Sequence, residues 1–112
     1  MASALAQRLE RIKELGGITS RDIAQLLDTT PETVSRWSSG KLDPQRDRLH
    51  RLLELELFLS ELAEFYSSEE VNLWLFSPHK LLGGKTAAAL IQAGETQHVF
   101  GLLDQLRSGA YV

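Results

Sequence analysis

Apolar residues recur every three or four positions along most of the chain, which is the spacing of one face of an α-helix. The first stripe consists of Leu5, Leu9, Ile12 and Leu15. It predicts a helix over residues 4–15 that ends at the glycine pair Gly16 and Gly17. The residues between the stripe positions are mostly polar, so this helix should be amphipathic.

Two shorter helices follow, and each opens with residues that favour a helix start. Thr19 and Asp22 have the spacing of a capping box, and Thr30 is followed by Pro31, which suits the first position of a helix. The inward positions expected for these helices are Ile23, Ala24, Leu26, Leu27, Val34 and Trp37. Two short helices joined by a tight turn, the second with a polar leading edge, are the parts of a helix-turn-helix.

The longest predicted helix runs from Pro44, with Asp43 as its cap, to about Tyr66. Its main stripe consists of Leu49, Leu52, Leu53, Leu59, Leu62, Ala63 and Tyr66. Four further residues make its middle apolar on nearly all sides: Leu55, Leu57, Phe58 and Phe65. Because such a helix is buried on several sides, we expect it to join the two halves of the protein, with part of it available for self-association.

Two alternatives apply to this segment. The helix could pack only within one chain, and the alternation of Leu and Glu over residues 53–57 could be read as a β-strand. The absence of β-branched residues and turn signals argues against the strand.

The last part of the chain also predicts helices, separated by a sharp corner. Ser67 and Glu70 form another capping box, and a Ser-Pro break is followed by a single turn closed by the glycines at 83–84. Two more helices are expected over residues 86–93 and 95–108. The pattern as a whole therefore predicts an all-α protein.

Composition narrows the class of protein. A chain of 112 residues makes one ordinary domain, or two very small ones that share a core. The absence of cysteine excludes disulfides and Cys-ligated metal sites. No apolar run approaches the ~20 residues of a membrane span, and the first residues lack the pattern of a signal peptide. We therefore expect a cytoplasmic protein without membrane contact.

Charge is distributed unevenly along the chain. Up to Arg51, nine Lys and Arg residues face seven Asp and Glu residues, a net charge of +2. After Arg51, three basic residues face eight acidic ones, a net charge of −5. This asymmetry suggests two different partners. The basic excess is small, so a single copy should bind DNA weakly.

Residues 22–41, with the sequence DIAQLLDTTPETVSRWSSGK, closely resemble the helix-turn-helix of the Xre/Cro family of phage repressors. In that family the first residues of the second helix contact base edges in the major groove. The resemblance implies that the DNA-binding residues are Ser20, Pro31, Glu32, Thr33, Arg36 and Lys41.

These residues would contribute in different ways. Arg36 could donate two hydrogen bonds to guanine, Glu32 could accept one from cytosine, and Thr33 could touch a thymine methyl group. Ser20 and Lys41 would contact phosphates, which position the protein without reading sequence. The alternatives are a solvated Arg36 and a Glu32 that interacts only with the helix dipole. Proteins with this fold can also lack DNA binding.

The last 45 or so residues resemble the C-terminal toxin-binding domain of the Xre/MbcA/ParS antitoxins. The matching residues are Trp74, Leu75, Pro78, Leu82, Gly83, Gly84, Lys85, Thr86, Leu90, Ile91, Val99, Leu102, Leu103, Leu106 and Gly109. His79-Lys80 departs from the family, in which Asn-Pro is frequent, and Ala87 and Ala89 replace Pro and Glu. The toxin-binding residues that the resemblance implies are Trp74, Lys85, Arg107, Ser108, Gly109, Ala110, Tyr111 and Val112.

The two resemblances together imply an antitoxin of a type II toxin–antitoxin system. Residues 1–48 would bind operator DNA, residues 49–66 would connect or oligomerise, and residues 67–112 would bind the toxin. The resemblance implies a RES-type toxin that consumes NAD, or a related ADP-ribosylating enzyme, whose substrate entrance the C-terminal end would close. A homodimer and a hetero-oligomer with the toxin are expected. A simple free tail is the alternative for this end.

Two other classes remain open, a stand-alone repressor whose C-terminal half only dimerises it and a helical adaptor that has lost DNA binding. Enzyme motifs are weak. The string Gly84-Lys85-Thr86 matches the end of a phosphate-binding loop, but that loop needs a glycine where the chain has His79. The three histidines lack metal-ligand spacing. We expect no catalysis, no metal and no cofactor.

Overall fold

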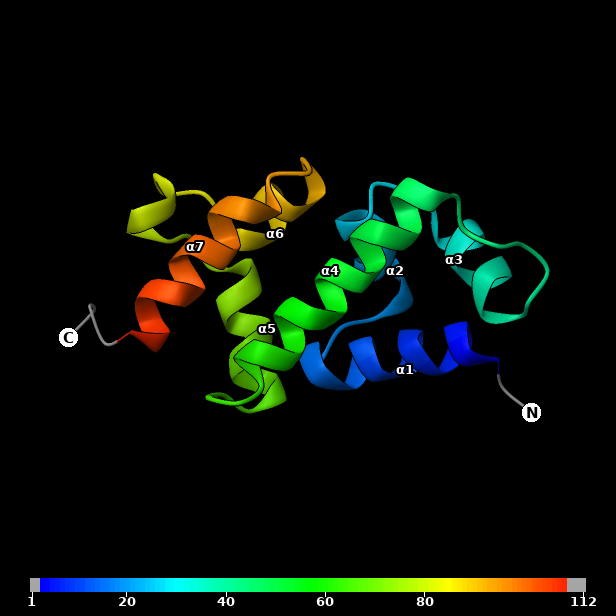
Figure 1. Ribbon diagram of the computed structural model, residues 1–112, viewed down its shortest axis with the longest axis horizontal. Coiled ribbons are helices and arrows are strands. Elements are labelled where there is room, and N and C mark those ends of the chain that lie inside the picture. The colour runs from blue at the N-terminus through cyan, green and yellow to red at the C-terminus, as the bar shows by residue number, and fades with distance from the viewer. Residues whose placement is uncertain (1–2, 109–112) are drawn as a thin grey trace.

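The computed structural model describes residues 3–108, apart from the side chain of Leu106. This part of the chain forms seven α-helices and one short 3₁₀ turn (Figure 1). They are α1 (Ala4–Gly16), α2 (Ser20–Leu26), α3 (Pro31–Ser38), α4 (Arg46–Leu62), α5 (Ser68–Phe76), η1 (Lys80–Leu82), α6 (Ala87–Gln92) and α7 (Thr96–Arg107). The all-α prediction is confirmed.

Most of the predicted helix starts are confirmed by their hydrogen bonds. The Thr19 hydroxyl accepts from the Asp22 N–H at 3.2 Å, while the Thr19 N–H donates to the Asp22 carboxylate at 2.9 Å. Ser67 and Glu70 make the same reciprocal pair at the start of α5. These bonds satisfy backbone donors that a helix start leaves without partners, so the caps set the boundaries locally.

The ends of the longest helix were predicted wrongly. The helix α4 begins at Arg46 rather than Pro44, and its cap residue Gln45 makes no side-chain hydrogen bond. Asp43 and Pro44 lie in a segment without regular secondary structure, ahead of the helix. At the other end, α4 stops at Leu62 rather than Tyr66. The capping box of the next helix needs an extended Ser67, which leaves the preceding residues in a turn.

One hydrophobic core runs through both halves of the chain. The helix α1 packs against both α4 and α5. The Asn72 side chain on α5 donates to the carbonyl oxygens of Gly16 and Gly17, at 3.3 and 2.9 Å. The fully buried Phe58 on α4 lies 5.6 Å from the Trp74 ring and 5.4 Å from the Phe100 ring, measured between centroids. The N-terminal and C-terminal halves are therefore joined by shared packing.

Among residues 3–108, other helices cover one side of α4. Its buried residues are Leu52, Leu55, Phe58, Leu59 and Leu62. Leu49, Leu53, Leu57 and the following Phe65 are exposed. The expected burial of Leu49 and Leu53 was therefore wrong, because the helices in contact with α4 cover the side that carries its buried residues. In Figure 1, α4 runs diagonally across the middle of the molecule, in front of α2 and between α1 and α7.

A partly buried polar contact ties α4 to the C-terminal half. The Arg51 guanidinium donates to the carbonyl oxygens of Ile91 and Gln92, each at 2.8 Å, at the end of α6. A helix C-terminus carries unpaired carbonyl groups and negative partial charge, so a guanidinium is well suited to it. None of the helices within residues 3–108 is long and apolar enough to cross a membrane.

Candidate interaction surfaces

The helices α2 and α3 pack closely against each other, and their inner faces are buried as predicted. Between them, Asp28 adopts a left-handed conformation with φ 55°, which Asp tolerates better than most residues. The N–H of Thr29 donates to the Ala24 carbonyl at 2.8 Å. These features bring the two helices together through a tight turn, the arrangement that the sequence predicted. We call the two helices the α2–α3 pair.

The six candidate DNA-binding residues lie on or beside this pair. Pro31, Glu32 and Arg36 are exposed on α3. Thr33 is half-buried, and its hydroxyl is hydrogen-bonded to that of Thr30 at 2.9 Å. The structure thus brings the α3 candidates together on one helix and leaves the Thr33 hydroxyl partly engaged.

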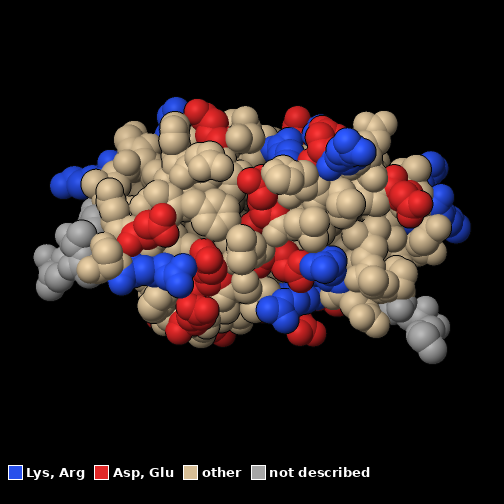
Figure 2. All heavy atoms as spheres, viewed as in Figure 1, with Lys and Arg blue, Asp and Glu red and all other residues tan. Residues whose placement is uncertain are grey.

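The other two candidates stand at the edges of the same region. Ser20 is the first residue of α2 and is half-buried. Lys41 is exposed, and its N–H donates to the Arg36 carbonyl at 2.9 Å, which holds the following loop against the end of α3. Figure 2 shows Lys and Arg side chains at this tip of the molecule beside acidic ones, and acidic and basic side chains together toward the opposite end.

One arginine beside this surface has a structural role that the sequence did not suggest. The Arg48 guanidinium donates to the Asp28 carbonyl at 3.2 Å and pairs with the Asp47 carboxylate at 2.9 Å. It therefore ties the start of α4 to the turn of the α2–α3 pair. A partner 20 residues away in the chain leaves no local pattern by which it could be found.

The corner between α5 and α6 is held mainly by its own backbone. Pro78 and Thr86 form a single antiparallel bridge, and the N–H of His79 donates to the Lys85 carbonyl at 3.0 Å. The N–H of Gly84 donates to the His79 carbonyl at 2.9 Å. Gly83 and Gly84 both have positive φ, which confirms the predicted glycine turn. We call residues 77–86 the corner.

The candidate toxin-binding residues Trp74 and Lys85 flank this corner in different environments. Trp74 is half-buried, with its ring 5.6 Å from Phe58 and 4.4 Å from His79. The His79 Nε2 donates to the Trp74 carbonyl at 2.8 Å. Lys85 is exposed. Trp74 therefore anchors the corner to the core and leaves only part of its surface for a partner.

The end of α7 carries two further candidates. Arg107 Nη1 lies 3.3 Å from Glu61 Oε1 on α4, and the Ser108 hydroxyl donates to the Gln105 carbonyl at 3.0 Å. The remaining candidates, Gly109, Ala110, Tyr111 and Val112, lie outside the described residues.

Exposed apolar residues surround the corner, and the sequence analysis did not single them out. Leu73 is 65% exposed, Leu81 is 50% exposed and Phe76 is also exposed. A hollow of about 430 Å³ lies next to Leu81, between the corner, α6 and α7. Its lining includes Leu81, Lys85, His98 and Leu102. The uninterrupted apolar run from Leu73 to Phe76 was the available signal, because a single helix face cannot bury all four residues.

Within residues 3–108, no three His, Cys, Asp or Glu side chains are grouped so that they could hold a metal ion.

Known proteins resemble this chain along its whole length. It is 35% identical to the mycobacterial cidal antitoxin MbcA of Mycobacterium tuberculosis over 112 residues, which are all of this chain and 96% of the relative. The MbcA of Mycobacterium bovis matches to the same extent. No family model matches the chain.

A solved structure shows the same likeness in three dimensions. A chain in the crystal structure of the M. tuberculosis MbcT–MbcA toxin–antitoxin complex superposes with a TM-score of 0.83 at 34% identity. The match covers 98% of this chain and 99% of that one. The fold is thus that of an all-α antitoxin. The chain belongs to the MbcA family of antitoxins.

Proposed function

We propose that this protein binds and neutralises a cognate toxin, a RES-type enzyme that consumes NAD or a related ADP-ribosylating enzyme. The observation that carries the proposal is the full-length likeness to a chain solved in a toxin–antitoxin complex. In this proposal the protein acts by binding alone and uses no metal or cofactor. Operator DNA and an NAD-consuming enzyme are both found in the cytoplasm, which we propose as its location.

The toxin would dock on the corner and the end of α7. Exposed apolar side chains that surround a rigid backbone can be buried without a large loss of conformational entropy. The charges of this half fit a basic nucleotide-binding enzyme, because Glu69, Glu95 and Asp104 are all exposed. Beyond Ser108 the chain supplies Tyr111, an aromatic residue of the kind that dominates interface energies. The end of the chain would thus close the substrate entrance.

Deleting Gly109–Val112 tests this mechanism. We expect the thermal midpoint to stay within a few degrees, because every core residue described within residues 3–108 is kept. Toxin activity should return, and it can be measured as NAD consumption by the co-purified complex and as growth arrest on co-expression. Removing Met1–Ala2 instead is the control and should leave neutralisation intact. Full neutralisation by the C-terminal deletion would exclude the plugging mechanism.

We further propose that the α2–α3 pair binds the operator of the protein's own operon. Its support is the exposure of Pro31, Glu32 and Arg36 on one edge of α3. Replacing Arg36 by Ala should cost roughly 1–3 kcal/mol of operator binding in a gel-shift titration. Lys80→Ala removes the same charge at the corner and should have a much smaller effect. Equal losses for the two variants would show that Arg36 acts only through net charge.

The oligomeric form proposed for both activities is a homodimer that assembles further with the toxin. Footprinting should then show dyad symmetry, and operator affinity should fall steeply as salt increases. A stand-alone repressor would share these DNA properties. Co-purification with the product of the neighbouring gene separates the two functions, since only the antitoxin should retain it.

A further inference from the structure

Three leucines form an exposed ridge along α4. Leu49, Leu53 and Leu57 are 37%, 38% and 53% exposed and are spaced four residues apart, which places them on one side of the helix. The opposite side of α4 supplies five fully buried residues to the core. An apolar ridge of this kind on a surface helix favours burial against another molecule.

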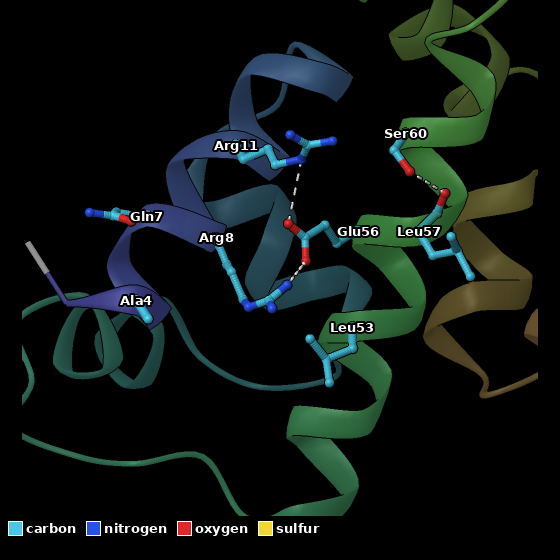
Figure 3. Close-up of a pocket in the computed structure, with 8 residues that line it drawn as sticks. All are labelled: Ala4, Gln7, Arg8, Arg11, Leu53, Glu56, Leu57 and Ser60. Carbon is cyan, nitrogen blue, oxygen red and sulfur yellow. Dashed lines mark hydrogen bonds and ion pairs between the residues drawn. The ribbon is translucent and has the colours of Figure 1, made fainter.

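A hollow of about 550 Å³ lies beside this ridge, between α1 and α4. The residues that line it are Ala4, Gln7, Arg8, Arg11, Leu53, Glu56, Leu57 and Ser60. Figure 3 shows the side chains of Arg8 and Arg11 reaching from α1 toward Glu56, with which both form ion pairs. The two arginines share one glutamate, so the hollow keeps a net charge of +1, while Leu53 and Leu57 form its apolar side, where a leucine could enter next to Leu57.

Charge is also polarised along α4. Its first half contains Arg46, Arg48 and Arg51 against one acidic residue, Asp47, and its second half together with the following turn contains Glu54, Glu56, Glu61 and Glu64. Several of these are engaged within the chain, but Arg46 and Glu64 are exposed and form no ion pair with other residues in the range 3–108. Two antiparallel copies of this helix would bring the basic half of each next to the acidic half of the other.

We propose that the ridge is the contact surface of a second copy of this chain, with the two α4 helices antiparallel. The ridge is symmetric about its middle residue, so a twofold axis at Leu53 places Leu49 of one copy opposite Leu57 of the other. Such a contact is self-complementary and closed, as in most homodimers. Each Leu49 then lies next to the partner's hollow, and Arg46 approaches the partner's Glu64. The inference deepens the proposed homodimer and rests on it.

Cysteine cross-linking tests the arrangement directly, because the chain contains no cysteine of its own. Under mild oxidation Leu53→Cys should form a disulfide-linked dimer. Leu49→Cys should not, because two copies of residue 49 lie about 12 Å apart along the helices, beyond the ~7 Å limit for a disulfide. Mixing Leu49→Cys with Leu57→Cys should restore the cross-link. Self-linking of Leu49→Cys without linking of Leu53→Cys would overturn the antiparallel arrangement.

Sedimentation of purified variants tests the surface itself. Leu53→Lys should raise the dissociation constant of the dimer at least about tenfold, because it places two like charges at the twofold axis. Leu73→Lys is the matched control, since Leu73 is a more exposed leucine on α5, and it should leave the dimer unchanged. Circular dichroism should show folded protein for both. The proposal would be overturned if the wild-type protein were a monomer, or if the two variants had the same dissociation constant for the dimer.

Toxin binding separates this inference from the proposed function. Leu53→Lys should still co-purify with the toxin, because the corner and α7 are unchanged. A wild-type dimer that cross-links as expected but has no affinity for the neighbouring gene product would disprove the toxin proposal and leave the dimer in place. Toxin binding by a wild-type chain that is monomeric would disprove the dimer and leave the toxin proposal in place.

Discussion

The exposed edge of α3 and the corner each lie next to one of the two tryptophans of the chain, but they are stabilised differently. Trp37 is 2% exposed and lies on the buried face of α3, so the exposed edge of that helix rests on a packed core. Trp74 is only half-buried, and the corner next to it is held by backbone hydrogen bonds, two left-handed glycines and the contact with His79. The first surface depends on apolar burial and the second on local polar geometry.

This difference predicts how each region responds to substitution. A change in the packed region should act on the whole fold, because core residues contact several elements at once. A change in the corner should act locally, since its hydrogen bonds close within ten residues. The contact between Arg51 and the end of α6 joins the two regions and should give an intermediate effect.

The largest effect is expected for Trp37→Ala. Removing a large buried aromatic side chain costs about 3–5 kcal/mol, a large part of the stability of a small domain. Urea unfolding followed by far-UV circular dichroism measures the loss. Trp74→Ala should cost less, because its side chain is only half-buried. A larger loss at Trp74 than at Trp37 would reverse the comparison.

A smaller loss is expected for Arg51→Met. It leaves the Ile91 and Gln92 carbonyl groups without their charged donor, and we expect destabilisation of about 2–3 kcal/mol. Arg21→Met, at an exposed position on α2, is the control and should stay within about 0.5 kcal/mol of the wild type. The same free energy of unfolding for both variants would mean that this contact does not join the two regions.

The corner should respond more weakly to Gly84→Ala. A Cβ atom there would meet no atom within 4 Å, so the cost comes only from the positive φ of 83° and should be about 1 kcal/mol. Gly101→Ala on α7 also meets no atom within 4 Å but has ordinary helical geometry, and it should stabilise the protein by about 0.5–1 kcal/mol. Opposite changes in the thermal midpoint are therefore expected, and shifts of the same sign would contradict the strain argument.

The smallest effect is a pH dependence at the start of α5. Hydrogen bonds from the Ser67 backbone N–H and then from its side chain lower the pKa of Glu70 below its ordinary value of 4.5. A carboxyl group with a lowered pKa in the folded state stabilises the protein above the unfolded pKa and loses this contribution as the pH falls. Glu70→Gln should therefore lower the thermal midpoint slightly at neutral pH and make no difference well below pH 4.5.

Glu69→Gln serves as the control for this measurement. It removes a carboxylate from the same turn that is not part of the capping box. A pH-dependent difference from the wild type that is as large for this variant as for Glu70→Gln would point to general charge rather than the cap.

Features set by neighbouring residues could be predicted from the sequence, and features set by distant ones could not. The capping boxes at Thr19 and Ser67 and the glycine turn of the corner close within a few residues, and all were predicted correctly. The partners of Arg51 and Asn72 lie 40 to 56 residues away, so no local pattern announces them.

The faces of α4 show the same limit. Leu49 and Leu52 have the same side-chain chemistry, and only the placement of the helices in contact with α4 decides that one is exposed and the other buried. The residues assigned to DNA and toxin contact came from resemblance to known families. The structure locates those up to Ser108, and their roles stay predictions.

The contact of Asn72 with the end of α1 has a consequence for any attempt to separate the two ends of the protein. Because α5 holds Gly16 and Gly17 in place, a cut in the loop between α4 and α5 would expose apolar surface on both fragments. We therefore expect that neither fragment, once separated from the other, folds as an independent module.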